Sequence, residues 1–120
     1  MTYAVTVFVD IDGTILKHHG KGLSAQITEE PVLLDGVIEK FNEWGALDYK
    51  IILITGRKES SRKETERQLA KMGVVYDQLI MGLPRGKRVV INDSKGDGKD
   101  TAGSVTVLRN AGLGLVEING

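Results

Sequence analysis

Two aspartates, two positions apart, are the residues of this sequence best suited to chemistry. Asp10 and Asp12 directly follow the apolar run 5–9, which is typical of a buried strand. Side chains at positions i and i+2 of a strand point the same way, so both carboxylates reach one place, and Gly13 lets the chain turn after them. Like charges held so close repel each other, and a bound cation relieves that repulsion. The pattern predicts a magnesium-dependent site for phosphoryl chemistry.

The two aspartates fit the two roles that hydrolysis of a phosphate monoester requires. Asp10 would attack phosphorus and form an aspartyl-phosphate. Asp12 would protonate the leaving alkoxide and then deprotonate the attacking water. A divalent cation is needed because the carboxylate and the phosphate repel each other. The alternative is an ordinary Asp-Gly turn after a strand, in which both acids are solvated.

A second polar cluster follows the apolar run 51–54. The hydroxyl of Thr55 and the backbone N–H of Gly56 would form an anion cradle for the transferring phosphoryl oxygens, near the start of a helix. A purely structural turn between strand and helix is at least as good an interpretation. Arg57 is a candidate for contact with the substrate phosphate, although we favour a solvated arginine at that position.

A third cluster follows the short apolar run 89–91. There Asp93 would complete a magnesium site with Asp10 and a backbone carbonyl, since magnesium prefers few carboxylates and several waters. The alternative is a loop aspartate that caps the turn before Ser94.

Basic residues just before this run are candidates for the cation that neutralises the phosphate and the phospho-aspartate. Lys87 is the first choice and Arg85 the second. A solvated basic loop is an equally good interpretation.

The apolar periodicity places these clusters in an α/β fold. It predicts strands at 3–9, 51–54, 77–81 and 89–91, helices at 31–47 and 59–72, and peripheral strands at 105–108 and 113–118, the last alternatively a loosely packed tail. Residues 13–30 show little periodicity and are expected to form a long loop or small hairpin flap above the first strand. Apolar strands alternating with helices predict a Rossmann-like three-layer sandwich with a mostly parallel central sheet. Ligands bind beyond the carboxyl ends of such strands, where all three clusters would lie.

Composition sets the limits within which this site must work. At 120 residues the chain predicts a single domain, 1–120, and it has no cysteine for a disulfide or a thiolate nucleophile. Sixteen basic and sixteen acidic residues cancel, which gives no support to nucleic acid or an anionic membrane as a partner, so we expect neither. The sequence shows neither a signal peptide nor an apolar run long enough to span a bilayer, so a cytoplasmic protein is expected.

These residues resemble the haloacid dehalogenase superfamily of phosphohydrolases. The sequence 10–14, Asp-Ile-Asp-Gly-Thr, resembles the first motif of that superfamily, 54–57 the second and 91–93 the fourth. The resemblance implies a phosphoric monoester hydrolase with Asp10 as nucleophile, Asp12 as acid and base, and magnesium held by Asp10, the Asp12 carbonyl and Asp93. It implies that the flap lies beside the active site.

No segment is large enough for the inserted cap domain of the superfamily, so the chain resembles its small capless members. Such members include enzymes that act on phosphorylated sugars, and they often form homo-oligomers. The resemblance therefore implies a small phosphorylated metabolite, such as a sugar phosphate, as the substrate. Two departures stand out: Leu83 precedes Pro84 where the third motif usually has lysine, and Asn92 replaces the first acid of the fourth motif.

Two other function classes stay open at this stage. A receiver-like signalling domain also uses acids, a threonine and a lysine at strand ends, but it lacks the Asp-x-Asp-Gly-Thr order. A degenerate member of the superfamily would bind a phosphorylated ligand without turning it over, which the missing lysine at position 83 motivates.

Overall fold

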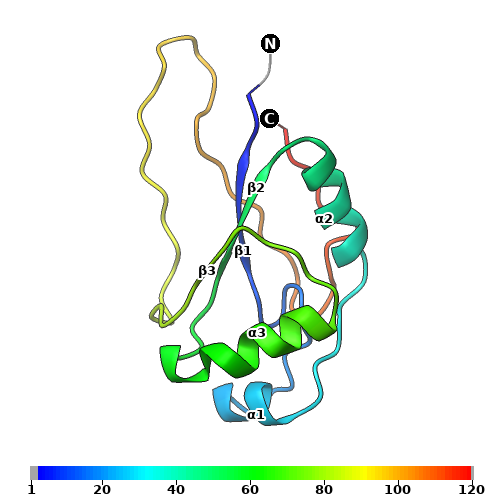
Figure 1. The fold of residues 1–120 in the computed structure, drawn as a ribbon. Helices are drawn as coiled ribbons and strands as arrows, with labels where there is room; N and C mark the ends of the chain where they lie inside the picture. Colours follow the sequence, from blue (N-terminus) through cyan, green and yellow to red (C-terminus); the bar gives the residue numbers. More distant parts are fainter. Residues whose placement is uncertain (1–2, 120) are drawn as a thin grey trace.

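The structure of the protein is a computed structural model, and it describes residues 3–119. The elements, in chain order, are β1 Thr6–Asp10, α1 Leu23–Thr28, α2 Val37–Ala46, β2 Lys50–Ile54, the 3-10 turn η1 Glu59–Ser61, α3 Arg62–Lys71 and β3 Gln78–Ile80. Strands and helices alternate along the chain, and Figure 1 shows the strands side by side with the helices around them. The predicted α/β fold is confirmed.

The three strands form a parallel sheet in the order β1-β2-β3. Asp10 is in register with Ile54, which is in register with Ile80, so all three carboxyl ends meet at one edge. Figure 1 shows this edge beside α1 and α3, and we refer to it as the carboxyl edge. The predicted mostly parallel sheet is therefore confirmed, and it delivers the first and second polar clusters to the same place.

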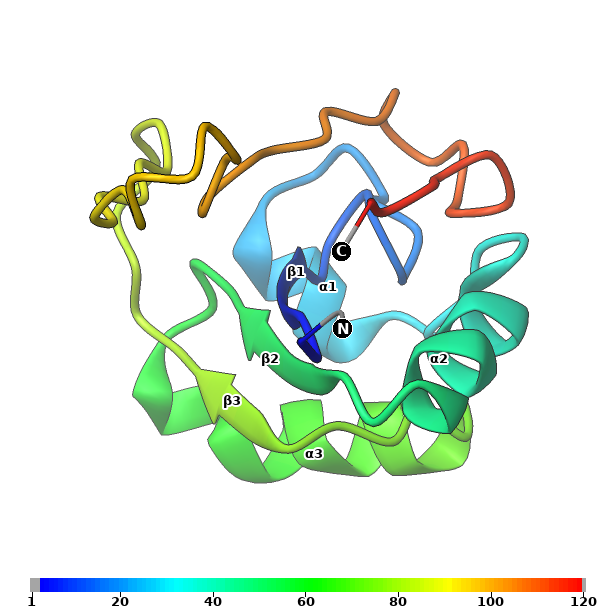
Figure 2. The ribbon, with the colours of Figure 1, turned by 90° about the horizontal axis from the view of Figure 1, so that it is seen from above.

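Alternate residues of each strand build the core. Val9, Leu53 and Leu79 occupy matching positions on the three strands and are buried. They belong to one apolar cluster with α2 and α3, the two helices that Figure 2 shows along one side of the molecule. Phe8, on the alternate face of β1, is 50% exposed. Among residues 3–119, no helix is long and apolar enough to cross a membrane.

The helix predicted at 31–47 begins later than expected, at Val37. The backbone of the residues before Val37 is instead hydrogen-bonded to the flap. Lys17 N–H donates to the Val32 carbonyl, and Leu34 N–H donates to the Ile15 carbonyl. A residue whose backbone is paired across the chain cannot also make helical hydrogen bonds, so the start predicted at Pro31 is wrong. The flap itself, 13–30, contains the short helix α1, which the sequence did not predict.

The chain beyond β3 differs most from the sequence prediction. None of the runs 89–91, 105–108 and 113–118 forms a strand in the described residues. Residues 84–106 leave the carboxyl edge, run toward the opposite end of the strands and return, as Figure 1 shows in yellow and orange. Ile91 at 93% and Val89 at 70% are exposed. The strand predictions there are wrong because a strand needs a partner, and these runs pair with none.

The final segment, 109–119, is irregular but packs on the core. Leu113 and Val116 are buried beside α2, so neither a peripheral strand nor a loosely packed tail describes it. Leu113 N–H donates to the Asp35 carbonyl at 2.8 Å. Gly112 adopts a φ of +83°, and a Cβ placed on it would overlap the Asp35 carbonyl oxygen. This close approach fixes the end of the chain against the start of α2.

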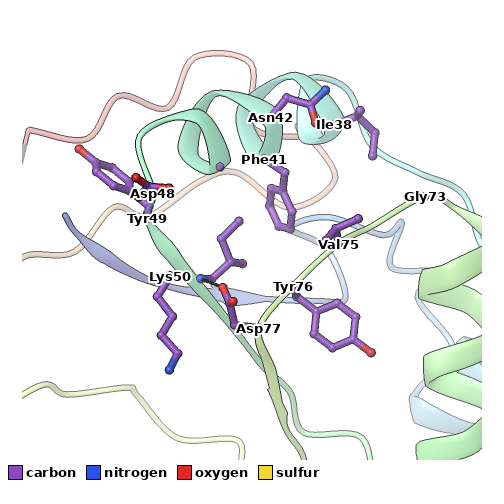
Figure 3. Close-up of a pocket in the computed structure, with 12 residues that line it drawn as sticks. Ile38, Phe41, Asn42, Asp48, Tyr49, Lys50, Gly73, Val75, Tyr76 and Asp77 are labelled. Atoms are coloured by element: carbon purple, nitrogen blue, oxygen red, sulfur yellow. Dashed lines mark hydrogen bonds between the residues drawn. The ribbon is translucent and has the colours of Figure 1, made fainter.

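A pocket of about 740 Å³ lies at the other end of the sheet, away from the carboxyl edge. Figure 3 shows Phe41 and Val75 beside it, with Lys50 at the start of β2 and Asp77 just before β3. The Asp77 carboxylate accepts a hydrogen bond from the Ile51 N–H at 2.7 Å, which joins the segment before β3 to β2. The size of this pocket does not make it the active site, because the acids predicted to act lie at the opposite ends of the strands.

Substituting Gly112 with alanine should destabilise the protein more than substituting Gly98. Both glycines have a positive φ, so each alanine incurs the left-handed strain of about 1–2 kcal/mol. Only at Gly112 does the new methyl also overlap backbone, which adds about 1–3 kcal/mol. Urea unfolding of Gly112→Ala and Gly98→Ala measures the difference, and equal losses would contradict the packing of the final segment.

Candidate active site at the carboxyl edge

Asp10 is the last residue of β1, one residue beyond the end of the strand predicted at 3–9, and a tight loop follows it. The N–H groups of Thr14, Ile15 and Leu16 all donate to the Ile11 carbonyl, at 2.9 to 3.1 Å. The loop thus folds around a single buried carbonyl, and Asp10 and Asp12 lie at its start. The Asp10 carboxylate accepts one long side-chain hydrogen bond, from the Thr14 hydroxyl at 3.4 Å.

The pKa of Asp10 is raised above its ordinary value. Burial is the largest cause, because it disfavours the charged form, and the negative charge of Asp12 raises the pKa further. The positive charge of Arg88 acts in the other direction but does not balance these effects. Asp10 therefore carries a negative charge that the protein compensates only in part.

Asp12 lies in a different environment, although it is only two residues away. Arg57 holds it in a two-point ion pair, with Nε donating to Oδ2 at 2.9 Å and Nη2 donating to Oδ1 at 2.7 Å. Gln26 from the flap adds a third hydrogen bond, from Nε2 to Oδ1 at 2.7 Å. Charge-assisted pairs of this geometry are the strong ones. The Asp12 carboxylate is thus fixed in place by β2 and the flap together.

Arg57 is 1% exposed, so the prediction of a solvated arginine is wrong. Its Nη1 donates to the Thr65 hydroxyl at 3.2 Å and to Gln68 Oε1 at 2.7 Å, both on α3. Four of its five N–H groups therefore donate to protein atoms. The sequence held a signal for this: Thr65, Gln68 and Leu69 share one helix face, and polar residues on a buried face need a partner.

Thr55 and Gly56 lie where the sequence places them, directly after β2. Thr55 is buried, and its hydroxyl oxygen accepts a hydrogen bond from the Arg57 N–H at 3.1 Å, which leaves the hydroxyl proton free to donate. Leu83 N–H donates to the Thr55 carbonyl, and Gly82 N–H donates to the Arg57 carbonyl. These two hydrogen bonds hold the residues that follow β3 against the second polar cluster.

The basic residues that follow β3 are exposed near this cluster. Among residues 3–119, Arg85 and Lys87 make neither a side-chain hydrogen bond nor an ion pair, whereas Arg88 donates through Nη1 to the carbonyls of Pro84 and Gly86. Arg88 is also the member of this group whose charge lowers the pKa of Asp10. The structure thus brings Arg88 toward Asp10 and does not single out Lys87 or Arg85.

Asp93 is not brought to the other acids. It lies in the segment 84–106, where its carbonyl accepts a hydrogen bond from the Thr101 hydroxyl at 2.6 Å. The neighbouring Asn92 donates through its side chain to the Thr101 carbonyl at 3.1 Å. Across the described residues, no group of three or more acidic, histidine or cysteine side chains is arranged to hold a metal.

The C-terminal segment supplies residues at the site that the sequence analysis missed. Asn110 N–H donates to the Gly13 carbonyl at 2.8 Å, and its side-chain amide accepts from the His18 N–H and donates to the His18 carbonyl. Arg109, next to it, passes close to Gly13: a Cβ on that glycine would lie 3.2 Å from Arg109 Cγ. A further cation therefore stands beside the loop that follows Asp10.

A divalent cation fits the first cluster in part. The Asp10 carboxylate is partly buried, incompletely compensated and weakly hydrogen-bonded, which suits an oxygen ligand of magnesium. The Asp12 carboxylate already accepts three hydrogen bonds, so only the backbone carbonyl of Asp12 would serve as a ligand there.

Comparisons with known proteins place the chain among phosphatase domains. Residues 4–97 match the family model of the polynucleotide kinase PNKP phosphatase domain. A structure of the Pnkp1/Rnl/Hen1 complex is similar at 32% identity with a TM-score of 0.58, over 70% of this chain and 30% of the matched chain. A structure of the Pnkp1/Rnl/Hen1 RNA repair complex is similar at 27% identity with a TM-score of 0.56, over 80% of this chain and 28% of the other.

A crystal structure of a structural-genomics target from Vibrio cholerae has the same fold, at 20% identity with a TM-score of 0.54, over 72% of this chain and 79% of that one. A comparison with curated proteins gave no match. The chain spans less than a third of the first two matched structures.

The expectation that excludes nucleic acid as a partner is wrong, because both matched structures are of the Pnkp1/Rnl/Hen1 complex and one of them is named as an RNA repair complex. That expectation rested on a net charge of zero. Net charge governs long-range steering of the whole molecule. A site for one phosphate group depends instead on local cations such as Arg85, Lys87 and Arg88, which are close in sequence.

Replacing Arg57 should destabilise the protein strongly. Arg57→Ala leaves the nearly buried Asp12 carboxylate without its ion-pair partner, which costs about 3–5 kcal/mol for buried pairs. Arg67→Ala is the matched control, because Arg67 makes a similar two-point contact with Glu64 but on the exposed face of α3. Chemical unfolding should place the control close to wild type. Similar losses for both variants would contradict the structural role of Arg57.

Neutralising Asp10 should stabilise the protein at neutral pH when no divalent cation is present. The folded state raises the pKa of Asp10 above the ordinary 3.8, so ionisation of Asp10 weakens folding above that raised pKa and has no effect below 3.8. Asp10→Asn should therefore raise the melting temperature at pH 7, and the gain should shrink as the pH falls toward 3.8. The exposed Asp100→Asn is the control, and a pH-independent gain would refute this interpretation.

Proposed function

The chain belongs to the family of the polynucleotide kinase PNKP phosphatase domain, and we propose that it removes a terminal phosphate from a nucleic acid strand with the help of magnesium. Membership of this family makes the chain a phosphatase of the haloacid dehalogenase superfamily. One observation carries the assignment of roles to residues. Asp10 and Asp12 share the carboxyl edge, where Arg57 and Gln26 hold the Asp12 carboxylate in one orientation, whereas the Asp10 carboxylate accepts only one long side-chain hydrogen bond.

The reaction would proceed in two displacements at phosphorus. An oxygen of Asp10 attacks, the bond from phosphorus to the leaving oxygen breaks, and Asp12, which must enter this step protonated, gives its proton to that oxygen. Asp12 then takes a proton from a water molecule, which attacks the aspartyl-phosphate and releases inorganic phosphate and the free Asp10 carboxylate. Magnesium bound to the Asp10 carboxylate and the Asp12 carbonyl would reduce the repulsion between Asp10 and the phosphate.

Groups around the carboxyl edge would bind the phosphoryl oxygens. The Thr55 hydroxyl has a proton to donate, and the Gly56 N–H is the proposed second donor. Arg57 has one N–H left beyond its protein contacts. A basic side chain of the segment after β3 would neutralise the remaining negative charge of the phosphate and the phospho-aspartate. Arg88 has the best support because its charge lowers the pKa of Asp10, and Lys87 and Arg85 are the other candidates.

A nucleic acid end is the proposed substrate for two reasons. The first is the similarity to structures of the Pnkp1/Rnl/Hen1 complex, one of which is named as an RNA repair complex. The second is the exposed group Arg85, Lys87 and Arg88, which leaves the carboxyl edge directly after the contact between Leu83 and Thr55. Cations beside an active site suit a substrate with further phosphates next to the reacting one. A small phosphorylated metabolite, such as a sugar phosphate, is the competing outcome of the test.

Asp93 remains a proposed ligand of magnesium, and this proposal needs a movement of its segment. The free edge of β1 is available to receive a strand, since β1 pairs with β2 alone among the described residues. The apolar run 89–91 just before Asp93 is exposed and rich in residues that favour strands. Docking of this run on β1 would extend the parallel sheet and carry Asp93 to the carboxyl edge.

A substrate panel tests the proposed function. We expect magnesium-dependent release of phosphate from an oligonucleotide with a terminal phosphate, faster than from glucose 6-phosphate or a mononucleotide. Asp10→Asn should abolish turnover, because it removes the nucleophile. Asp93→Asn should raise the magnesium concentration needed for half-maximal activity, whereas Asp100→Asn, in the same exposed segment, should not.

Other outcomes would decide against parts of this proposal. Faster turnover of the sugar phosphate would overturn the nucleic acid substrate while keeping the phosphatase. Binding of an oligonucleotide phosphate without turnover of any ester in the panel would favour a degenerate, non-catalytic domain. An unchanged magnesium requirement in Asp93→Asn would remove Asp93 from the metal site.

A further inference from the structure

The side chain of Gln26 closes a ring of hydrogen bonds around the proposed acid. Gln26 Nε2 donates to Asp12, which pairs with Arg57, and Arg57 donates to Gln68. Gln68 Nε2 then donates to the backbone carbonyl of Gln26 at 3.0 Å. The ring joins the loop after β1, the end of β2, α3 and the flap helix α1. We call these four residues the Gln26 ring.

Gln26 also holds the flap in shape. Its Oε1 accepts a hydrogen bond from the His19 N–H at 2.6 Å, and its Nε2 donates to the Lys17 carbonyl at 2.9 Å as well as to Asp12. Both amide N–H groups and the amide oxygen are therefore in use, and the side chain is 3% exposed. The amide cannot rotate by half a turn without placing its oxygen against two acceptors, so its orientation is fixed.

The helix that carries Gln26 depends on these contacts. It has only six residues, its N-cap is Gly22, and no side chain caps its first turn. Helices this short are unstable on their own, so tertiary contacts must hold them. Gln68 donates to the carbonyls of Gln26 and Ile27 in the last turn of α1. The position of the flap and the position of Asp12 are thus set by the same hydrogen bonds.

The two carboxylate oxygens of Asp12 accept different numbers of hydrogen bonds within the Gln26 ring. Oδ1 accepts from Arg57 Nη2 and from Gln26 Nε2, whereas Oδ2 accepts from Arg57 Nε alone. A carboxylate oxygen accepts about two hydrogen bonds, so Oδ1 is saturated and Oδ2 keeps one open position. Without Gln26 both oxygens would have an open position, and the carboxylate would lose its contact with the flap.

We propose that Gln26 is a positioning residue, which fixes the Asp12 carboxylate and directs proton exchange with the substrate to Oδ2. This inference rests on the proposed function, in which Asp12 protonates the leaving oxygen. It assigns to the flap a role in the proton transfer as well as in covering the site. Gln26 acts through Asp12 and is not itself required to touch the substrate.

Leaving groups of different basicity provide the test. Gln26→Met keeps the length of the side chain but removes its hydrogen bonds, and it is compared with wild type on p-nitrophenyl phosphate and on an oligonucleotide terminal phosphate. The nitrophenolate leaves without a proton, whereas the sugar oxygen needs one. Because general acid catalysis contributes about 10²–10⁴-fold, we expect kcat/KM, which reports the step that expels the leaving group, to fall at least about tenfold on the oligonucleotide and much less on the nitrophenyl ester.

The ratio of the two kcat/KM values is the deciding quantity, because a variant that is partly unfolded loses both activities equally and because the second displacement is common to both substrates. Thr28→Ala is the control: it removes an exposed hydrogen bond to the Ser24 carbonyl on the same helix and should leave the ratio unchanged. Equal losses on both substrates, or no loss, would overturn the role of Gln26. Wild-type turnover on the same plates reports separately on the proposed function.

Discussion

The ion pair between Arg57 and Asp12 is the contact on which the rest of the site depends. It joins the loop after β1 to the end of β2, and the remaining donors of Arg57 reach α3. Burying two charges is costly unless they are well paired and further hydrogen bonds satisfy their remaining groups. Here Thr65 and Gln68 supply those bonds, and no side-chain polar atom buried in residues 3–119 lacks a partner. The pair therefore defines the geometry of the edge.

The same pair gives the two acids different surroundings, which suit the different roles proposed for them. Asp12 faces a guanidinium and an amide, whereas the burial of Asp10 and its proximity to Asp12 raise the pKa of Asp10. A group that moves a proton must be held in a constant orientation, and Asp12 has that orientation. A nucleophile that also binds a cation must instead keep free lone pairs, and Asp10 has them because its one side-chain hydrogen bond is long. Neighbouring positions thus have distinct surroundings, and each suits the role proposed for it.

The sequence predicted the elements that depend on a local apolar pattern. It did not predict the features that depend on contacts between segments distant in the chain. The strand before Asp10 and the strand before Thr55 are apolar runs, and their parallel pairing brought both polar clusters to one edge. The burial of Arg57 was missed because it depends on α3, and α1 was missed because Gln26 and Gln68 hold it. The run 89–91 has the composition of a strand but no partner in the structure. The single domain, the homo-oligomer, the cytoplasmic location and the roles of the site residues stay predictions.

The way the carboxyl edge is covered bears on the kind of substrate it suits. In the described residues, the cover consists of the flap with α1 and the contact of Asn110 with Gly13 and His18, and no separate domain lies over the acids. An active site gains electrostatic strength when water is excluded from it. A small ester adds little bulk to exclude water from an edge that only the flap covers, whereas a polymer end brings its own bulk and further phosphates for the exposed arginines and lysine. The geometry of the edge thus agrees better with a strand end than with a small metabolite.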